Sequence, residues 1–297
     1  MLYLLHKIKY NKYKVKEMKE LIVKEKNELY SYLRKNLTNI SKNNIKSLLK
    51  NETVYINNKI VTKYNHELNI GDKITIGKNI KTENINLKIL YEDDNIIVID
   101  KPTKILTISN KNEKEETLYR KVSDYLKKQN KKVFVIHRLD FDTSGIIMFA
   151  KNQKIQKLYQ DNWNNLAKER EYTAVVEGIT KDSDHIESYL KQTKTLLVYS
   201  SKNKDGYFSI TDYKKISNNN KYSLLKIYIS TGRRNQIRCH MSDIHHPIAG
   251  DTRYNSKTNP LGRLCLHAST LKITNPLNNE LMIFKSDIPK EFITLTK

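Results

Sequence analysis

From residue 87 to its end, the chain is a succession of short apolar runs separated by turn residues. Runs such as "NIIVID", "GIIMFA" and "YSLLKIYI" are rich in Ile, Leu, Val and Tyr and have the length of strands. Asn, Asp, Gly or Pro stands at the ends of most of them. Many strands with only three or four helical segments predict an α+β domain with a mainly antiparallel sheet over residues 87–297.

The expected elements of this domain follow from the same patterns. Helical spacing predicts helices at 117–129, at 152–168 and after the turn at 231–235. Strands are expected at 87–92, 95–101, 145–150, 170–178, 207–216, 222–230, 263–274 and 280–286. No internal repeat is present.

Before this domain, a shorter stretch has a different pattern. Leu29, Leu33 and Leu37 recur every four residues and predict a helix, and Ser41 is a good N-cap for a second one. Two short strand patterns follow, joined by an Asn-Asn turn and a Gly-Asp turn. On the second helix one face is apolar and the neighbouring face carries Lys42, Lys46 and Lys50.

The charge balance favours a phosphate-rich partner. The 297 residues include 54 Lys and Arg against 32 Asp and Glu, a formal net charge of +22. Abundant Lys, Asn and Ile throughout would also follow from a general bias in composition, but a basic chain with interleaved tyrosines suits a phosphate-rich partner. Two cysteines without a CxxC pattern indicate a reducing, cytoplasmic setting, and neither a signal peptide nor a membrane span is expected.

The stretch "HRLDFDTSG" at 137–145 places charged side chains at the start of an apolar strand. Asp, Thr, Ser and Gly are ordinary turn residues, so a surface turn explains them without any function. Alternatively, one of the two carboxylates does chemistry. The surrounding motifs decide between the two interpretations.

This stretch resembles the HRLDxxTSG signature of the RluA-type pseudouridine synthases. Further motifs agree in order: "IIVIDKP" with "LLVVNKP", "KEREYTAVVEG" with "KEYLALVxG", and "TGRRNQIRCHM…HHPIAGD" with "TGRTHQIRVHL…GHPLLGD". "RLCLHASTLKITNP" is similar to "RQALHAYRLSFTHP". The resemblance covers residues 87–297 and implies the pseudouridine synthase fold, a mixed, mainly antiparallel sheet with flanking helices and a central cleft. It implies no cofactor and no metal.

The resemblance also implies the catalytic residues. Asp140, after "HRL", would be the catalytic carboxylate, attacking the sugar, adding to the ring or removing a sugar proton. Arg238, in "NQIR", would be the cation that holds it ionised. Tyr172 would lie against the uracil and serve in proton transfer, although strand spacing alone indicates a core residue.

Other positions are expected to bind the substrate. Arg138 would stabilise RNA displaced by base flipping or contact a phosphate, and His137 is expected to be a structural hydrogen-bonding residue in the substrate site. Ile237 and Leu266 would lie under the base, or form simple core. Asp142 is expected to cap the turn rather than pair with Asp140. Departures such as Arg234 and Asn235 in "GRRNQIR" affect substrate preference rather than catalysis.

Residues 41–59, "SKNNIKSLLKNETVYINNK", resemble the RNA-binding module of ribosomal protein S-four, with its run "SR..I..LI..G.V.VNGK". The implied organisation is an N-terminal extension at 1–26, this module at 27–77, a linker at 78–86 and the catalytic domain at 87–297. Arg34, Lys42, Lys46 and Lys50 are the expected RNA contacts. A solvated lysine face is the alternative.

The function expected is an RNA pseudouridine synthase, acting as a monomer on large-subunit ribosomal RNA without a protein partner. Transfer RNA is a second possible substrate. The rival functions are a non-catalytic RNA-binding or ribosome-assembly protein and a glycoside-cleaving enzyme using Asp140 and Asp142. The Cys and His residues of the C-terminal half lack zinc-finger spacing, so no metal site is expected.

Overall fold

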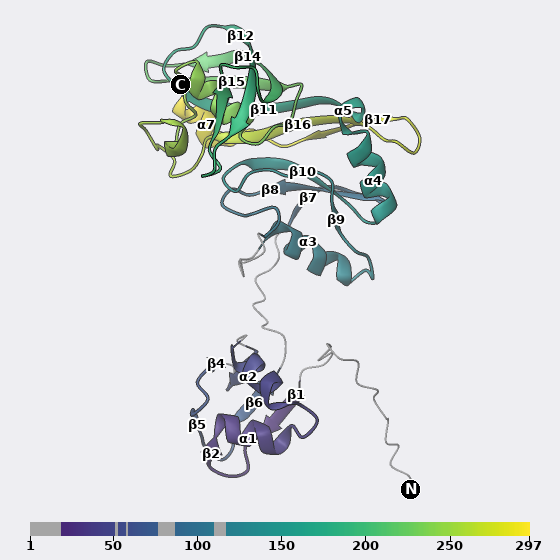
Figure 1. Ribbon diagram of the computed structural model, residues 1–297. Coiled ribbons are helices and arrows are strands. Elements are labelled where there is room, and N and C mark those ends of the chain that lie inside the picture. The colour runs from purple at the N-terminus through teal and green to yellow at the C-terminus, as the bar shows by residue number, and fades with distance from the viewer. Residues whose placement is uncertain (1–18, 51–52, 58, 77–86, 110–116) are drawn as a thin grey trace. The chain divides into compact units, whose positions relative to one another are not determined.

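A computed structural model of the chain describes residues 19–50, 53–57, 59–76, 87–109 and 117–297 (Figure 1). The chain divides into two compact units, within residues 1–84 and 85–297. The linker expected at 78–86 and most of the expected extension lie outside the described residues. No helix in the described part of the chain is both long and apolar enough to cross a membrane.

Unit 1 contains the two expected helices and the expected hairpin. A four-stranded sheet has the order β1-β6-β3-β4, and a separate pair joins β2 and β5. Strand β1 lies in the range expected to be an extension, but it pairs with β6 along its whole length and belongs to this sheet. The bounds are β1 Lys19–Ile22, β2 Asn27–Glu28, α1 Leu29–Asn36, α2 Lys42–Lys50, β3 Val54–Ile56, β4 Lys59–Ile60, β5 Glu67–Leu68 and β6 Lys73–Ile76.

Helix α2 has the two faces that its sequence predicts. The Ser41 hydroxyl accepts a hydrogen bond from the Asn44 backbone N–H at 3.3 Å and caps the helix. Ile45 and Leu49 are buried in the core of unit 1, while the three lysines of the neighbouring face are exposed. Packing of the apolar face against α1 and the sheet therefore leaves the basic face open to solvent.

Unit 2 is built on one large sheet. Its strand order is β13-β12-β14-β15-β11-β16-β10-β8-β7, with β17 paired to β16 and β9 paired to β10. All pairs are antiparallel except β10 with β16, so the prediction of a mainly antiparallel α+β domain is confirmed. The strands are β7 Lys88–Glu92, β8 Ile96–Lys101, β9 Phe134–Val135, β10 Ser144–Ala150, β11 Ala167–Glu177, β12 Ser183–Gln192, β13 Val198–Ser201, β14 Tyr207–Asn218, β15 Tyr222–Ile229, β16 Leu266–Thr274 and β17 Leu281–Lys285.

The helices of unit 2 cover both faces of this sheet. Every residue of β10 is buried, because α3 packs on one face and α4 on the other. Ile147 and Phe149 point to the α3 side, and Ile146 and Met148 to the α4 side. Figure 1 shows α3 and α4 beside this part of the sheet. The helices are α3 Leu118–Lys127, α4 Gln153–Asp161, α5 Trp163–Leu166, α6 Gln236–Asp243, α7 Lys290–Leu295 and the 3-10 turn η1 Thr252–Tyr254.

The structure differs from the sequence predictions in two places. The helix expected at 152–168 ends at Asp161, and after the short α5 the chain enters β11 at Ala167. The backbone of Asn162 is not helical (φ −117°, ψ 13°), which separates the two helices. Strands β9, β12 and β13 and helix α7 are additional elements. Strand β12 alternates exposed and covered residues at an outer position of the sheet.

Parallel pairing of β10 with β16 fixes the place of the "HRLDFDTSG" stretch. Ser144 pairs with His267 and Gly145 with Ala268. Gly145 has φ +107°, and a Cβ atom there would lie 2.2 Å from the Ala268 carbonyl oxygen, so only glycine fits. The segment 137–143, with its charged side chains, directly precedes β10. It therefore lies at the middle of the sheet, beside β11 and β16.

Candidate active site

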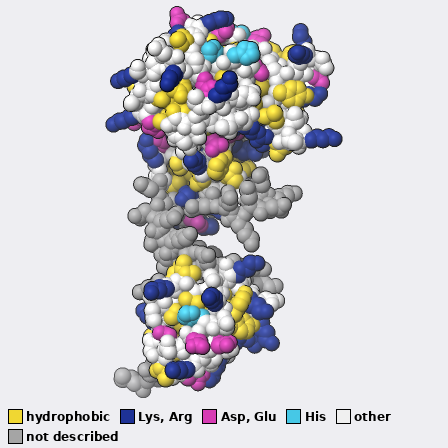
Figure 2. All heavy atoms as spheres, turned by 90° about the vertical axis from the view of Figure 1, so that its left-hand side faces the viewer, with side chains coloured by type: hydrophobic (Ala, Val, Ile, Leu, Met, Phe, Trp, Pro, Cys, Tyr) yellow, Lys and Arg dark blue, Asp and Glu magenta, His cyan; other side chains and the backbone are white. Residues whose placement is uncertain are grey.

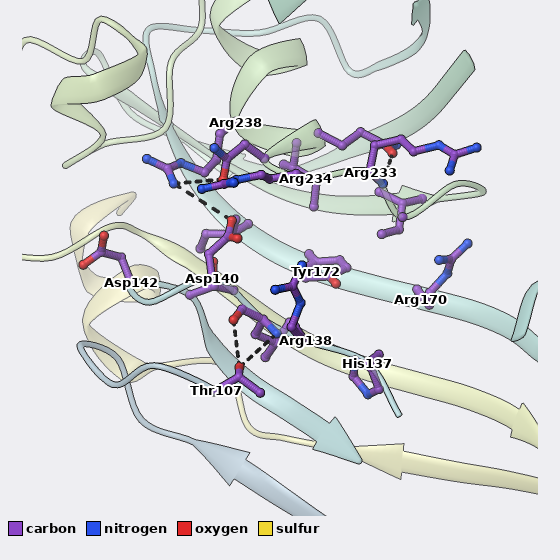
Figure 3. Close-up of a pocket in the computed structure, with 18 of the residues that line it drawn as sticks. Thr107, His137, Arg138, Asp140, Asp142, Arg170, Tyr172, Arg233, Arg234 and Arg238 are labelled. Atoms are coloured by element: carbon purple, nitrogen blue, oxygen red, sulfur yellow. Dashed lines mark hydrogen bonds and ion pairs between the residues drawn. The ribbon is translucent and has the colours of Figure 1, made fainter. Parts of the chain in front are cut away.

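A cleft of about 770 Å³ opens at this point of unit 2. Residues 136–143, the loop at 229–235, the start of α6 and the loop at 250–253 line it, and Tyr172 and Leu266 contribute from β11 and β16. Its charged groups are mostly cations (Figure 3). They are Arg138, Arg170, Arg233, Arg234, Arg238 and Arg253, against Asp140, Asp142 and Asp251.

The loop that carries Asp140 is held from behind through its backbone. Thr107 Oγ1 donates to the Leu139 carbonyl at 2.8 Å and accepts from the Leu139 N–H. Thr103 Oγ1 donates to the Asp142 carbonyl at 2.8 Å. Fully buried Lys101 donates to the carbonyl of Phe141 at 3.2 Å and to two carbonyls of its own loop. Because the backbone on both sides of Asp140 is fixed, its carboxylate has a defined position.

Lys101 also places a positive charge behind this loop. Burial lowers the pKa of its ammonium to about 8, and the charges of Asp140 and Asp142 partly oppose that shift. Within the described part of the chain the ammonium donates its hydrogen bonds to backbone carbonyls, so its charge is not cancelled by a short ion pair. Lys101 was not identified from the sequence, although it belongs to the "IIVIDKP" motif.

Arg238 reaches Asp140, but its short contacts are with another residue. Its Nε and Nη2 donate to the two carboxylate oxygens of Asp251 at 2.6 and 2.7 Å, while its Nη1 lies 3.9 Å from Asp140 Oδ2. The guanidinium also packs over the Tyr254 ring at 5.0 Å. Its Nη1 also donates to Asn235 Oδ1 at 3.2 Å. The prediction that Arg238 is the cation beside Asp140 is therefore incomplete, because Asp251 holds the arginine.

Asp251 was missed because nothing next to it in the sequence indicates its role. It stands 13 residues after Arg238, at the end of "HHPIAGD", and its side chain is 1% exposed. The loop around it is held by Glu177, whose carboxylate accepts hydrogen bonds from Ser256 and from the backbone of Lys257 and Thr258. The pairing depends on this loop packing against α6, which is a tertiary contact.

Opposing effects act on the pKa of the Asp140 carboxyl. Its side chain is 36% exposed, and it lines the cleft rather than the outer surface. Burial raises the pKa above the ordinary aspartate value, and the nearby cations, foremost Arg238 and Arg234, oppose this rise without cancelling it. Figure 3 shows the carboxylate directed toward Arg238 and Arg234, whereas that of Asp142 points elsewhere.

Tyr172 lies in the same cleft, on β11. Burial raises the pKa of its phenol to about 12, and the nearby Arg170 guanidinium acts in the opposite direction. The phenol is therefore protonated at neutral pH. Its ring also packs against two clusters of core residues. Tyr172 is therefore partly a core residue and partly a residue of the cleft wall.

His137 is a structural residue at the edge of the cleft. Its Nε2 accepts the Met148 backbone N–H at 3.1 Å, and its ring lies against Trp163 with centroids 4.7 Å apart. Burial lowers the pKa of the imidazole to about 4, so it is neutral and can accept this hydrogen bond. A substrate contact from His137 would have to use the remaining ring nitrogen.

The other expected substrate-binding residues line the same cleft. Arg138 is exposed, while Ile237 and Leu266 are buried in the core at 5% and 3% exposure and reach the cleft wall. In unit 1, Arg34 and Lys42 line a shallow hollow between α1 and α2, and Lys46 and Lys50 are exposed along α2. Each position is thus accessible to a ligand or borders a space that could hold one.

The loop before α6 contains arginines that the sequence interpretation did not assign. Gln236 holds this loop by accepting from the Arg233 N–H at 3.1 Å and from the Thr231 hydroxyl at 2.7 Å. Arg170 donates to the Ser230 carbonyl at 2.7 Å, and a Cβ atom at Gly232 would lie 2.8 Å from its guanidinium. In the sequence, Arg170 stands in the run "REY", and Arg233 and Arg234 stand in the run "TGRR". These two runs could have indicated the arginines.

The described residues contain no group of three or more His, Cys, Asp or Glu side chains placed to hold a metal ion. The Cys and His residues of the C-terminal half serve other contacts. Both cysteines are free and buried, and burial raises the pKa of each thiol to about 12. His240 contacts Ser188 and Thr211, and His267 contacts Ser144.

Comparison with known proteins agrees with this geometry. The family model described as RNA pseudouridylate synthase matches residues 95–243, half of the chain. The chain is 28% identical over 277 residues to "Ribosomal large subunit pseudouridine synthase D" of Haemophilus ducreyi, covering 86% of this chain and 85% of that protein. It is also 28% identical over 292 residues to an "Uncharacterized RNA pseudouridine synthase" of Bacillus subtilis, covering 94% and 96%.

Solved structures support the fold. The human protein "RNA Pseudouridylate Synthase Domain Containing 1" matches with a TM-score of 0.58 at 22% identity, covering 68% of this chain and 83% of that one. The human "Domain Containing 4" protein matches with a TM-score of 0.57 at 18% identity, covering 69% and 90%. At these identities the likeness concerns the fold alone.

Proposed function

The chain belongs to the RNA pseudouridylate synthase family, and from this premise we propose that it isomerises uridines in large-subunit ribosomal RNA with Asp140 as the catalytic carboxylate. It is an RNA pseudouridine synthase. The reaction breaks the bond between sugar C1′ and ring N1, turns the uracil and joins C5 to C1′. The proton lost from C5 is balanced by one gained at N1, so no redox change occurs.

One observation carries the assignment of Asp140. Of the two carboxylates in the "HRLDFDTSG" stretch, Asp140 is the one directed toward the arginines of the cleft, on a loop whose backbone is fixed on both sides. Arg238 and Arg234 favour its ionised form, which is the form that attacks a carbon or removes a proton. Asp142 carries the same chemical group two residues away but points elsewhere.

The remaining cleft residues have supporting roles in this proposal. Tyr172, protonated at neutral pH, lies against the uracil and serves in proton transfer at the ring carbon. Ile237 and Leu266 form the apolar wall under the base. Arg138, exposed beside Asp140, contacts the RNA from which the target nucleotide has been flipped out. His137 fixes the start of the motif through the Met148 N–H.

We further propose that the part of unit 1 from β1 to β6 forms an S-four-type RNA-binding module, so that its N-terminal boundary lies before the expected residue 27. The order of two helices and a hairpin supports it, together with the exposed face of Lys42, Lys46 and Lys50 and the nearby Arg34. Figure 2 shows Lys and Arg side chains over the visible surface of unit 1 and of unit 2. The proposal includes a cytoplasmic protein that acts as a monomer. Both cysteines are free and buried, which is compatible with a reducing compartment.

The test is to map pseudouridines in the RNA of cells with and without this protein. We expect one or more sites in large-subunit ribosomal RNA to disappear with the gene and to return with the wild-type protein. Cells that carry Asp140→Asn should lack the sites, and cells that carry the matched variant Asp142→Asn should keep them. Sites that disappear from transfer RNA instead would contradict the proposed substrate, and sites that persist with Asp140→Asn would contradict the catalytic residue.

A further inference from the structure

An exposed aromatic ring adjoins the cleft at the first residue of β14. Tyr207 is 68% exposed, and the guanidinium of Arg233 lies over its ring at 5.1 Å from the centroid. Arg233 itself lines the cleft, so the ring and the cleft are connected through this arginine. We call the Tyr207 ring with the Arg233 guanidinium the ledge.

The position of the ledge follows from the alternation of β14. Tyr207, Ser209 and Thr211 point to the same face of the strand, and Ser209 and Thr211 are fully buried there. Thr211 contacts Gln236 and His240 of α6, so this helix covers the face at its level. Tyr207 lies four residues before Thr211, at the strand end, where its ring stays open to solvent.

Core packing does not account for this tyrosine. A ring that is 68% exposed removes little apolar surface from water, and its phenol has no hydrogen-bond partner among the described residues. The arginine beside it is fixed at its backbone by Gln236, 3.1 Å from the Arg233 N–H. The pair therefore offers the ring face that is turned away from the guanidinium, together with an exposed cation on the other face.

These two groups match the two parts of an unpaired nucleotide. A base stacks on an aromatic ring whatever its identity, and a guanidinium binds a phosphate or stacks in turn. Flipping a uridine into the cleft also leaves neighbouring bases without their stacking partner. In Figure 3, Arg233 and Asp142 lie at opposite ends of the drawn residues.

We propose that the ledge binds a nucleotide flanking the target uridine, with its base stacked on Tyr207 and its phosphate on Arg233. The inference rests on the proposed function for the identity of the RNA, but the binding of an unpaired base does not depend on isomerisation. It adds a contact for substrate outside the catalytic residues. Its expected signature is therefore a change in affinity rather than in the chemical step.

The first experiment separates base stacking from phosphate contact. Binding of a hexauridylate and of an abasic ribose–phosphate oligomer of the same length is measured for the full-length wild type, Tyr207→Ala, Tyr207→Phe and Tyr199→Ala. Tyr199 is a matched control: it is 40% exposed in the same sheet, and its pairing with Lys191 places it on the opposite face. We expect Tyr207→Ala to weaken hexauridylate binding roughly 5- to 150-fold, the range of one stacked base, and to leave the abasic oligomer unchanged. Tyr207→Phe, which keeps the ring, and Tyr199→Ala should bind both like the wild type.

Two outcomes would overturn the proposal. If Tyr207→Ala binds hexauridylate like the wild type, no base stacks there. If its affinity for both oligomers falls equally, the tyrosine supports a phosphate contact or the local fold instead. Circular dichroism and the melting temperature of each variant separate the last two explanations.

A second measurement connects the ledge to the reaction. With an RNA whose uridine the wild type isomerises, Tyr207→Ala should raise KM and leave the single-turnover rate at saturating RNA unchanged. An equal loss in that rate would contradict a binding role. If the wild type isomerises no RNA while hexauridylate binding still depends on Tyr207, the proposed function is wrong, but the proposal that the ledge binds an unpaired base is supported.

Discussion

At the scale of single residues, the site is a carboxylate whose pKa is raised by burial and held down in part by an arginine that Asp251 also binds. Arg238 holds Asp251 with two short hydrogen bonds and lies 3.9 Å from Asp140. Because Asp251 already fixes the guanidinium, no movement of Arg238 is needed to place a charge beside Asp140. Such preorganisation is how a cation lowers a barrier without reorganising during the reaction.

The pH dependence of activity should report this arrangement. Burial raises the pKa of Asp140, so the active, ionised form is lost as pH falls through a value above that of an ordinary aspartate. Arg238→Met removes the largest effect that opposes burial. The acid limb of the pH–rate profile, where activity falls at low pH, should therefore move to higher pH. Single-turnover rates from pH 5 to 9 for wild type, Arg238→Met and Asp142→Asn test it. The limb of Asp142→Asn should stay in place, and coincident profiles for Arg238→Met and wild type would show that Arg238 does not act on Asp140.

Stability distinguishes the two partners of Arg238. Arg238→Met leaves the 1% exposed Asp251 carboxylate without its counter-ion, and breaking such a pair from one side typically costs about 3–5 kcal/mol of unfolding free energy. In Arg238→Met/Asp251→Leu both charges are gone, so most of that loss should be recovered. The double variant should still lose activity at a higher pH than the wild type, because it also lacks Arg238. Denaturant unfolding of both variants measures this, and equal stabilities would mean that Asp251 is not the main partner.

At the scale of elements, what could be predicted from the sequence depended on local patterns. The alternating apolar runs predicted the central strands, and Ser41 with its leucine and isoleucine spacing predicted α2. Asp140, Tyr172, Arg238 and Arg138 were named from motifs, and all four line one cleft. Each of these features is recognised from a few consecutive residues, so it can be predicted from the sequence alone.

The features that could not be predicted are tertiary. The Arg238–Asp251 pair requires the loop after residue 250 to fold back onto α6, and the Thr107 and Lys101 contacts join segments 32 and 40 residues apart. The apolar spacing of 152–168 continues past Asn162, but the chain must enter the sheet at Ala167 to pair with β16. Sheet pairing therefore overrode the local helical pattern.

The basic face of α2 gives a prediction for this element. Lys42, Lys46 and Lys50 are exposed, and no carboxylate among the described residues forms an ion pair with them. Replacing all three with Gln should weaken binding to long RNA and reduce the salt dependence by roughly one unit of slope for each phosphate that a lysine no longer neutralises. The matched control changes the exposed Lys285, Lys290 and Lys297 of unit 2 to Gln. Equal slopes for the two triple variants would mean that net charge, rather than this face, determines binding.

At the scale of the whole molecule, the chain combines the cleft of unit 2 with a large excess of positive charge. A net charge of +22 attracts any polyanion and gives no sequence preference by itself. In our proposal, selection of a target then comes from contacts that need a particular RNA shape. These are the cleft, in which the flipped base is proposed to bind, and the basic helical face of unit 1. The division into two units makes it possible to separate these contributions by experiment.

Each unit has a hydrophobic core of its own, so the two should unfold in separate steps. The core of unit 1 includes the fully buried Leu33, and a core of unit 2 includes the fully buried Leu126 on α3. Leu33→Ala should cost unit 1 about 2–5 kcal/mol of unfolding free energy, because it leaves a cavity that the surroundings fill only partly. Calorimetry should then show one transition lowered and the other unchanged, and Leu126→Ala should show the reverse. Above its lowered transition, Leu33→Ala should bind long RNA more weakly and still isomerise a short RNA at the wild-type single-turnover rate. A single transition that moves with either substitution would mean that the two units fold as one, and that RNA binding and catalysis cannot be separated at this boundary.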